Sequence, residues 1–342
     1  MKRFMTGLCM CVWLALCSVA PVLAADDLAS EQARRQVEQP LNNAPVWKEV
    51  RSGQQNYTSV RGVDAGVLIN PGGQTWRALR NGPVTLYGGL IFCVFALAIG
   101  AFYKIRGKIM LSEPKTGRLI ERFNSAERIA HWSMAISFCI LMASGLVMLF
   151  GKHVLLPVIG YTLFGLLAQL CKNVHNFVGP VFLMSVLFFI VMFVKDNVWQ
   201  AIDALWIRKV GGLVSGEHVP SHRFNFGEKT WFWLGVVFLG LLVSASGLVL
   251  NFPNFEQGRL LMQQANIVHV VSALIIMTLS LGHIYIGTLG MEGAIDGMKS
   301  GYVDETWAKE HHELWYNAAK HTARHSDEIQ RSPDTSGSVA RT

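Results

Sequence analysis

The stretch IVHVVSALIIMTLSLGHIYI, residues 267–286, decides the fold of this chain. It is an apolar run of about the 20 residues that an α-helix needs to cross a bilayer. Apart from two imidazoles, His269 and His283, it carries no group that is charged near neutral pH. In a helix, two residues 14 positions apart are separated by about 21 Å along the axis, and their side chains point within roughly 40° of the same direction. One helix therefore presents two imidazoles on one side, one in each leaflet.

Similar apolar runs precede this one and predict an all-α membrane protein with five transmembrane helices. The runs cover residues 84–102, 129–151, 173–194, 230–250 and about 265–291.

Residues 153–171 are also apolar, and the loop charges decide how we interpret them. If they do not span, the loops 103–130 and 195–229, with seven and five Lys or Arg residues, fall on one side. The positive-inside rule makes that side cytoplasmic. We therefore predict that residues 153–171 lie flat on the outer surface, with the N-terminus outside the cytoplasm and the C-terminus inside.

Composition excludes several classes of protein. Hydrophobic residues make up 51% of the 342 residues and charged residues 15%, against about 25% charged in a typical soluble domain. This excludes a disordered chain, a soluble nucleic-acid binder and a simple cytosolic enzyme. The net charge of +7 fits cytoplasmic loops of a membrane protein. None of the six cysteines forms a CxxC pair, so the sequence indicates neither a zinc site nor an iron–sulfur cluster.

The N-terminal part divides into two predicted segments. Residues 1–24 have the basic start, apolar core and small-residue end of a signal peptide, with an uncleaved anchor helix as the alternative. Residues 25–83 are polar and predict a loosely structured periplasmic region. Further along, residues 199–213 place apolar side chains at helical spacing, which predicts a helix on the inner interface.

Ionisable groups inside a membrane are costly and usually functional, and here the spans contain almost only imidazoles. His175 lies at the outer start of its helix and matches His269 in depth; we call these the outer pair. His131 lies at the cytoplasmic start of its helix and matches His283; we call these the inner pair. The arrangement predicts two haems, each with two axial histidines. The alternative is four interior histidines that are merely hydrogen-bonded, whereas a di-metal site is disfavoured because the pairs lie far apart and lack carboxylates.

A short repeat offers room for a flat ring. Ala143-Ser144-Gly145-Leu146-Val147 recurs as Ala245-Ser246-Gly247-Leu248-Val249. Gly145 is 14 residues beyond His131, so it returns to the same helix face at the depth of the outer pair. Small residues allow close approach of a macrocycle or, as the alternative, of another helix. The other histidines lie in loops or the tail, where a solvated or structural role is the default; they are His153, His218, His222, His311, His312, His321 and His325.

The pattern resembles the gamma subunit of respiratory formate dehydrogenase, a di-haem membrane cytochrome b. The resemblance runs from about Phe123 to Tyr316. The motifs that match the family's four haem-ligand positions are Glu127-Arg128-Ile129-Ala130-His131-Trp132, Asn173-Val174-His175-Asn176-Phe177-Val178-Gly179, Ile267-Val268-His269 and Gly282-His283-Ile284-Tyr285. The tail segments Gly297-Met298-Lys299-Ser300-Gly301 and Trp307-Ala308-Lys309-Glu310-His311-His312-Glu313-Leu314-Trp315-Tyr316 are the most specific signature.

The resemblance implies a four-helix di-haem cytochrome b domain over residues 123–291, followed by a cytoplasmic tail over residues 292–342. The segment 84–102 is then an extra N-terminal transmembrane helix of a longer variant. The four histidines would bind the iron of two haem b groups. A quinone, menaquinone or ubiquinone, would bind beside His283 at a loop that matches Asn225-Phe226-Gly227, with Glu228 where a Gln can occur.

The function that the resemblance implies is electron transfer in anaerobic respiration. Electrons would pass from a periplasmic iron–sulfur beta subunit to the quinone at the cytoplasmic side of the bacterial inner membrane. Formate oxidation would take place on a molybdopterin-containing alpha subunit. The alternatives are the cytochrome b subunit of a nickel–iron hydrogenase or another quinone-linked dehydrogenase, and, from a different class, a haem-free membrane anchor or transporter.

Overall fold

The computed structural model describes residues 44–53, 72–209, 219–255 and 257–331, with a few single positions besides. The chain divides into two units, residues 1–71 and 72–342. In the first unit the structure describes a short helix, α3 (Ala44–Arg51). The predicted signal peptide and most of the predicted periplasmic region lie outside the described residues.

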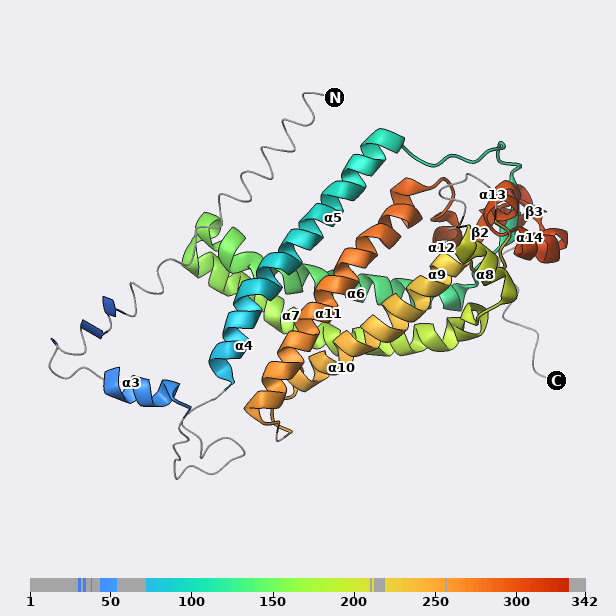
Figure 1. The fold of residues 1–342 in the computed structure, drawn as a ribbon. Helices are drawn as coiled ribbons and strands as arrows, with labels where there is room; N and C mark the ends of the chain where they lie inside the picture. The colour runs from blue at the N-terminus through green and yellow to red at the C-terminus, as the bar shows by residue number, and fades with distance from the viewer. Residues whose placement is uncertain are drawn as a thin grey trace. The chain divides into compact units, whose positions relative to one another are not determined.

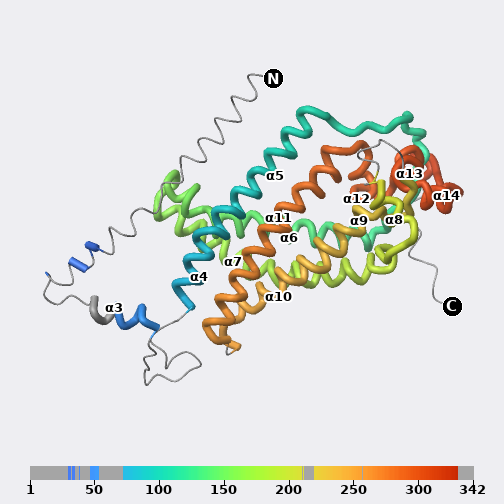
Figure 2. The backbone as a smooth tube through the Cα atoms, viewed as in Figure 1, coloured from blue at the N-terminus to red at the C-terminus, as the bar shows by residue number. Residues whose placement is uncertain are grey.

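Five helices of the second unit are long and apolar enough to cross a membrane, which confirms the predicted fold class. α5, α11 and α10 lie side by side, and α7 packs on α10 and on α6 (Figure 1). Figure 2 shows the same bundle as a tube, with the helices running between its two ends. The helices are α5 (Thr85–Arg106), α6 (Ser125–Val154), α7 (Leu156–Phe193), α10 (Gly240–Asn251) and α11 (Arg259–Tyr285).

The first long helix begins earlier than its apolar run. α4 (Gly73–Leu79) and the π-helical η1 (Arg80–Val84) lead into α5, so residues 73–106 form one span. The chain bends at Gly82, whose φ and ψ of −92° and −106° are not helical. Pro83 follows, and the ring of a proline disfavours helical geometry in the residue before it. Residues 73–83, predicted to belong to the loosely structured region 25–83, are therefore part of a kinked helix.

Within the described residues, 153–171 do not form a sixth span, as predicted, and their flat position on the outer surface stays a prediction. α6 continues to Val154, and α7 starts at Leu156 and breaks only at Gly160, where φ is 74°. From Tyr161 on, the segment is continuous with the rest of α7, because no charged run or further helix breaker interrupts it before Pro180. The short helix η2 (Val194–Asn197) then ends this span.

The fourth span begins with two short elements. α9 (Phe226–Thr230) leads into the π-helical η4 (Trp231–Leu239), which continues as α10. The segment 199–213, predicted as an interfacial helix, contains the helix α8 (Ala201–Arg208), and its position at the membrane interface stays a prediction. The last span ends in the π-helical η5 (Ile286–Gly290).

A small domain of strands and short helices covers one end of the bundle, which we call the sheet end. Its antiparallel sheet has the order β2-β1-β3 and pairs Ile120 with Val303. Both of these side chains are buried against Trp307 and Ala308. The elements are β1 (Arg118–Glu121), α12 (Asp296–Ser300), β2 (Tyr302–Asp304), α13 (Glu305–His311), α14 (Glu313–Ala319), η6 (Lys320–Thr322), β3 (Arg324–His325) and α15 (Ser326–Arg331).

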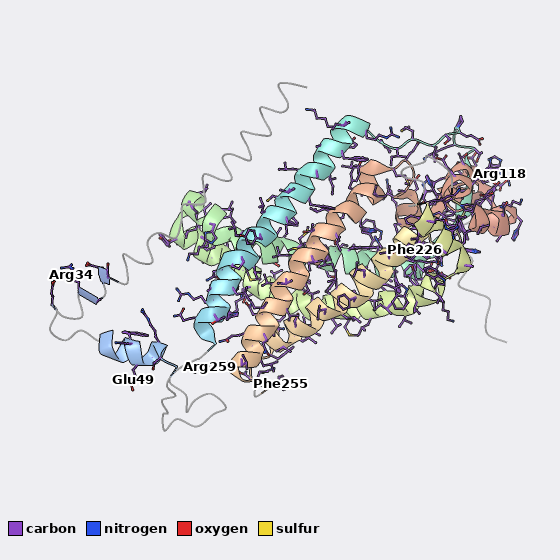
Figure 3. The ribbon with its side chains drawn as sticks, viewed as in Figure 1. Arg34, Glu49, Arg118, Phe226, Phe255 and Arg259 are labelled. Atoms are coloured by element: carbon purple, nitrogen blue, oxygen red, sulfur yellow. The ribbon has the colours of Figure 1, made fainter. Side chains whose placement is uncertain are left out.

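The two ends of the bundle carry different sequence features. Figure 3 shows Arg118 and Phe226 toward the sheet end, whereas Phe255 and Arg259 lie at the opposite end. In the described part of the C-terminal tail, β2 and β3 pair with β1 in the loop that precedes α6.

Candidate functional site

The four histidines of the spans lie in two pairs inside the bundle. The ring centres of His175 on α7 and His269 on α11 are 6.1 Å apart. Those of His131 on α6 and His283 on α11 are 6.4 Å apart. The structure therefore brings together the same partners that the depth argument paired.

These separations suit a single metal ion between two rings. Two imidazoles that bind one iron from opposite sides, each at a metal–nitrogen distance of about 2.0 Å, place their ring centres about 6 Å apart. Within the described ranges, no group of three or more His, Cys, Asp or Glu side chains could hold a metal ion. A site with two protein ligands per metal fits haem, whose porphyrin supplies the other four donors.

The outer pair is held by hydrogen bonds at one ring nitrogen. Nδ1 of His175 lies 2.9 Å from Oγ of Ser144, and Nδ1 of His269 lies 2.9 Å from the carbonyl oxygen of Val243. Ser246 adds a 3.3 Å contact to His269. Metal-binding histidines usually use their second nitrogen in this way, which fixes ring orientation and tautomer. Nε2 of each outer histidine is thereby left for a metal.

The predicted glycines face the same rings. A Cβ atom added to Gly145 would lie 3.5 Å from Cε1 of His175, and one added to Gly247 would lie 3.0 Å from Cε1 of His269. Each copy of the Ala-Ser-Gly-Leu-Val repeat thus supplies a serine that contacts one outer imidazole and a glycine that leaves room beside it. The repeat serves the site as well as helix packing.

A cavity of about 300 Å³ adjoins the outer pair. Its walls are mostly apolar side chains of α6, α7, α10 and α11. Besides the two histidines, the polar or charged residues in its lining are Arg80, Asn176, Ser244, Asn251 and Asn266. A flat, largely apolar group with a polar edge fits these walls.

The inner pair has a more aromatic environment. Trp231 stacks on His283 with 5.0 Å between ring centres and an interplanar angle of 14°. Phe189 and Trp132 lie beside His131. Nδ1 of His131 is buried and has no hydrogen-bond partner among the described residues. One more hydrogen-bonding or coordinating partner is therefore expected at this end.

The predicted quinone loop forms the start of α9. Oδ1 of Asn225 accepts the backbone N–H of Glu228 at 3.0 Å, and the Glu228 carboxylate accepts the N–H of Asn225 at 2.9 Å. This is a capping box, and it leaves the amide nitrogen of Asn225 as a donor. Gly227 lies against the ring of Trp206. Trp231, one helical turn after Gly227, stacks on His283 and so links this loop to the inner pair.

The sequence reasoning missed a buried cluster beside this loop. Nη2 of Arg122 donates to Glu228 at 2.9 Å and lies 3.0 Å from Nε2 of His312. Nδ1 of His312 donates to the carbonyl oxygen of His222 at 2.8 Å. His312 is 1% exposed, and burial, together with the Arg122 charge, lowers its pKa to about 3. His312 is therefore a neutral side chain that contacts Arg122 and the backbone of His222 beside the predicted quinone loop.

A second buried contact also went unpredicted. Nζ of Lys229 donates to the carboxylate of Asp203 at 2.7 Å, and both side chains are almost fully buried. This pair fixes α8 to the start of the fourth span. The contact was missed because 26 residues separate its partners and neither has a distinctive sequence context.

A signal for the cluster was present in the sequence. Arg122-Phe123-Asn124-Ser125-Ala126-Glu127 recurs as Arg223-Phe224-Asn225-Phe226-Gly227-Glu228. Each copy begins a helix with an Asn-x-x-Glu capping box. The arginines cross over: Arg122 binds Glu228, and Arg223 binds Glu127 at 2.7 Å.

The remaining predicted histidines lie away from the two pairs. His153, His222, His321 and His325 are exposed, and His311 is partly buried against Trp307. His218 lies outside the described residues.

Comparison with known proteins gives consistent matches. The family model of the prokaryotic cytochrome b561 matches residues 122–301. The chain is 33% identical over 210 residues to the formate dehydrogenase cytochrome b556(fdo) subunit of Escherichia coli strain K12, covering 59% of this chain and 94% of that relative. It is 27% identical over 201 residues to the formate dehydrogenase cytochrome b556 subunit of Haemophilus influenzae, covering 58% and 82%. It is also 26% identical over 206 residues to the nitrate-inducible cytochrome b556(Fdn) subunit of E. coli K12, covering 58% and 91%.

Proposed function

The chain belongs to the prokaryotic cytochrome b561 family, and from that premise we propose that it is the membrane cytochrome b subunit of a formate dehydrogenase. The relatives named above, which are 26% to 33% identical to it over 201 to 210 aligned residues, are all cytochrome b subunits of formate dehydrogenases. The observation that carries the proposal is the pairing of four imidazoles in two places inside a five-helix bundle.

The proposed axial ligands are His175 and His269 for an outer haem b, and His131 and His283 for an inner one. Haem b bound by two histidines supplies one-electron exchange and leaves its iron no open position for oxygen. The role of the chain is then to hold the four ligands. Ser144 and the carbonyl of Val243 orient the outer imidazoles, while Trp231 stacks against the inner ligand His283.

The proposed direction of electron transfer is from the outside inward. A periplasmic iron–sulfur subunit would deliver electrons at the outer pair, and a molybdopterin-containing subunit would oxidise formate. A quinone would receive the electrons beside His283, where Asn225 and Gly227 begin α9. The amide nitrogen of Asn225 is a donor suited to a quinone carbonyl, because its oxygen is already used by the helix cap.

This direction conserves energy. Inward movement of negative charge opposes a potential that is negative inside, at about 2.3 kcal/mol per charge per 100 mV. Protons taken from the cytoplasm by the reduced quinone add to the charge separation. The proposed location is therefore the bacterial inner membrane, with the N-terminus in the periplasm and the C-terminus in the cytoplasm.

The test is to remove one ligand of each pair in turn. His283→Ala is expected to lose the inner haem and keep the outer, and His269→Ala is expected to do the reverse. Haem content and the reduced-minus-oxidised spectrum of the purified complex measure both effects. His153→Ala, which changes an exposed imidazole, is the matched control and keeps both haems. A His283→Ala variant with two intact haems would contradict the assignment.

The co-purifying subunits decide between related functions. A molybdopterin-containing partner with formate-oxidising activity supports the proposal, whereas a nickel–iron partner would show a hydrogenase cytochrome b. A purified wild-type complex without haem would indicate a membrane anchor or transporter instead.

A further inference from the structure

Arg80 is the one charged residue in the described lining of the cavity at the outer pair. It comes from η1, in the N-terminal span that precedes residues 122–301, which the cytochrome b561 family model matches. The kink at Gly82 and Pro83 lies directly after it. The extra helix therefore brings a cation to a cavity whose other walls belong to the four-helix domain.

The guanidinium of Arg80 lacks a charged partner within the described part of the chain. Nη1 donates to the side chain of the neighbouring Asn81 at 2.9 Å, and no carboxylate pairs with Arg80 in the described ranges. Its Nε is buried without any hydrogen-bond partner there. A buried donor left without a partner is unfavourable, and more so when the group is charged. An anion that enters the cavity would satisfy this donor.

Trp76, in the same span as Arg80, orients the side chain of Asn266 so that its amide nitrogen is a second donor. Nε1 of Trp76 donates to Oδ1 of Asn266 at 3.2 Å, which turns the amide nitrogen of Asn266 away from Trp76. Asn266 lines the cavity together with Arg80. A guanidinium and an amide N–H at one cavity form a recognition set for a carboxylate.

A haem b group carries two propionate carboxylates, and it must bring both into the protein. We propose that Arg80 binds a propionate of the outer haem, with Asn266 as a second donor. The inference rests on the proposed function, because it requires a haem between His175 and His269. The N-terminal helix is then part of the haem site, and its cation raises the midpoint potential of the outer haem by favouring the reduced, more negative state.

The experiment compares Arg80→Gln with Arg80→Lys and with Arg77→Gln, a change at an exposed arginine of the same helix. A redox titration of the purified complex is followed through the haem absorbance bands. Arg80→Gln is expected to shift the reduction equilibrium of the outer haem about tenfold toward the oxidised form, which for one electron is about 59 mV. Arg80→Lys keeps the charge and recovers part of the shift. Arg77→Gln leaves both potentials unchanged, and the inner haem is unaffected in all three variants.

Loss of the outer haem in Arg80→Gln, with the inner haem retained and both haems present in Arg80→Lys, would also support the proposal. Unchanged potentials in an Arg80→Gln variant with full haem content would overturn it, and the proposed function would stand. An absence of outer haem from the wild-type complex would overturn the proposed function itself, and with it the role proposed for Arg80.

Discussion

At the scale of single residues, the two pairs differ in what holds their second ring nitrogen. The outer imidazoles have their Nδ1 atoms fixed by Ser144 and by the carbonyl of Val243. At the inner pair, Nδ1 of His131 has no such partner among the described residues. Because hydrogen bonds to this nitrogen set ligand basicity and orientation, the two sites are expected to differ in redox potential.

His312 gives a prediction about pH. Its pKa is lowered to about 3 by burial and by Arg122, so it stays neutral in the folded protein at mildly acidic pH. In the unfolded chain it takes up a proton below about pH 6.5. The unfolded state therefore binds more protons, and stability falls as the pH drops from about 6.5 toward 3, by up to about 1.4 kcal/mol per pH unit.

The measurement is the thermal midpoint of the purified complex at about pH 7 and about pH 5, the upper part of that window. His312→Gln is expected to lower the midpoint at pH 7, since it disturbs the contacts with Arg122 and His222. It should also show a smaller decrease between the two pH values than the wild type. The control is His222→Gln, whose side chain is exposed. Equal pH dependence in the wild type and His312→Gln would contradict this account.

At the scale of elements, α6 and the fourth span share the same two sequence motifs in the same order. These are the Arg-Phe-Asn-x-x-Glu motif at the start and the Ala-Ser-Gly-Leu-Val motif further along. Arg122 and Ala143, which open the two motifs of the first copy, are 21 positions apart, whereas Arg223 and Ala245 are 22 apart. The second copy contains the π-helical η4 between them. A π-helical segment accommodates one inserted residue within a helix and occurs frequently at functional sites. The extra residue is therefore absorbed between the two motifs, within the segment that begins with Trp231. Trp231 stacks on His283.

The glycine of the second repeat gives a prediction at this scale. A Cβ atom on Gly247 would lie 3.0 Å from the ring of His269, so the larger side chain of Gly247→Leu would push the imidazole from its place. We expect loss of the outer haem with the inner haem retained. Gly165→Leu, at a position on α7 with no atom within 4 Å of an added Cβ, should keep both. Haem content measures the outcome, and two intact haems in Gly247→Leu would refute the close approach.

Local and periodic features of this fold could be predicted from the sequence, whereas long-range contacts between short elements could not. The long spans follow from hydropathy, and the pairing of His175 with His269 follows from helix geometry, because both are local or periodic properties. β1, β2 and β3 are two to four residues long, too short for an alternating pattern, and they pair across long stretches of chain. The Arg122–Glu228 contact is likewise long-range, and only the repeated Arg-Phe-Asn-x-x-Glu motif indicated it.

At the scale of the whole molecule, the two ends of the bundle carry the evidence for its orientation. The sheet end contains the loop before α6 and the described parts of the loop between α7 and α9 and of the C-terminal tail. The first two of these loops carry most of the Lys and Arg residues found between spans. The positive-inside rule therefore predicts that the sheet end faces the cytoplasm. In this proposed orientation the outer pair would lie near the periplasm, where an electron donor outside the cytoplasm could reach it.

Cysteine labelling tests this orientation directly. In a variant whose Cys93, Cys139 and Cys171 are changed to Ser, Asn254→Cys lies in the exposed loop between α10 and α11, and Thr322→Cys lies in the exposed tail domain. A membrane-impermeant maleimide should label the first in intact spheroplasts and the second only after lysis. The reverse pattern would place the quinone loop outside the cytoplasm, and electron transfer through the two pairs would then lower the charge separation instead of adding to it. Retained haem content in both variants shows that the labelled protein is folded.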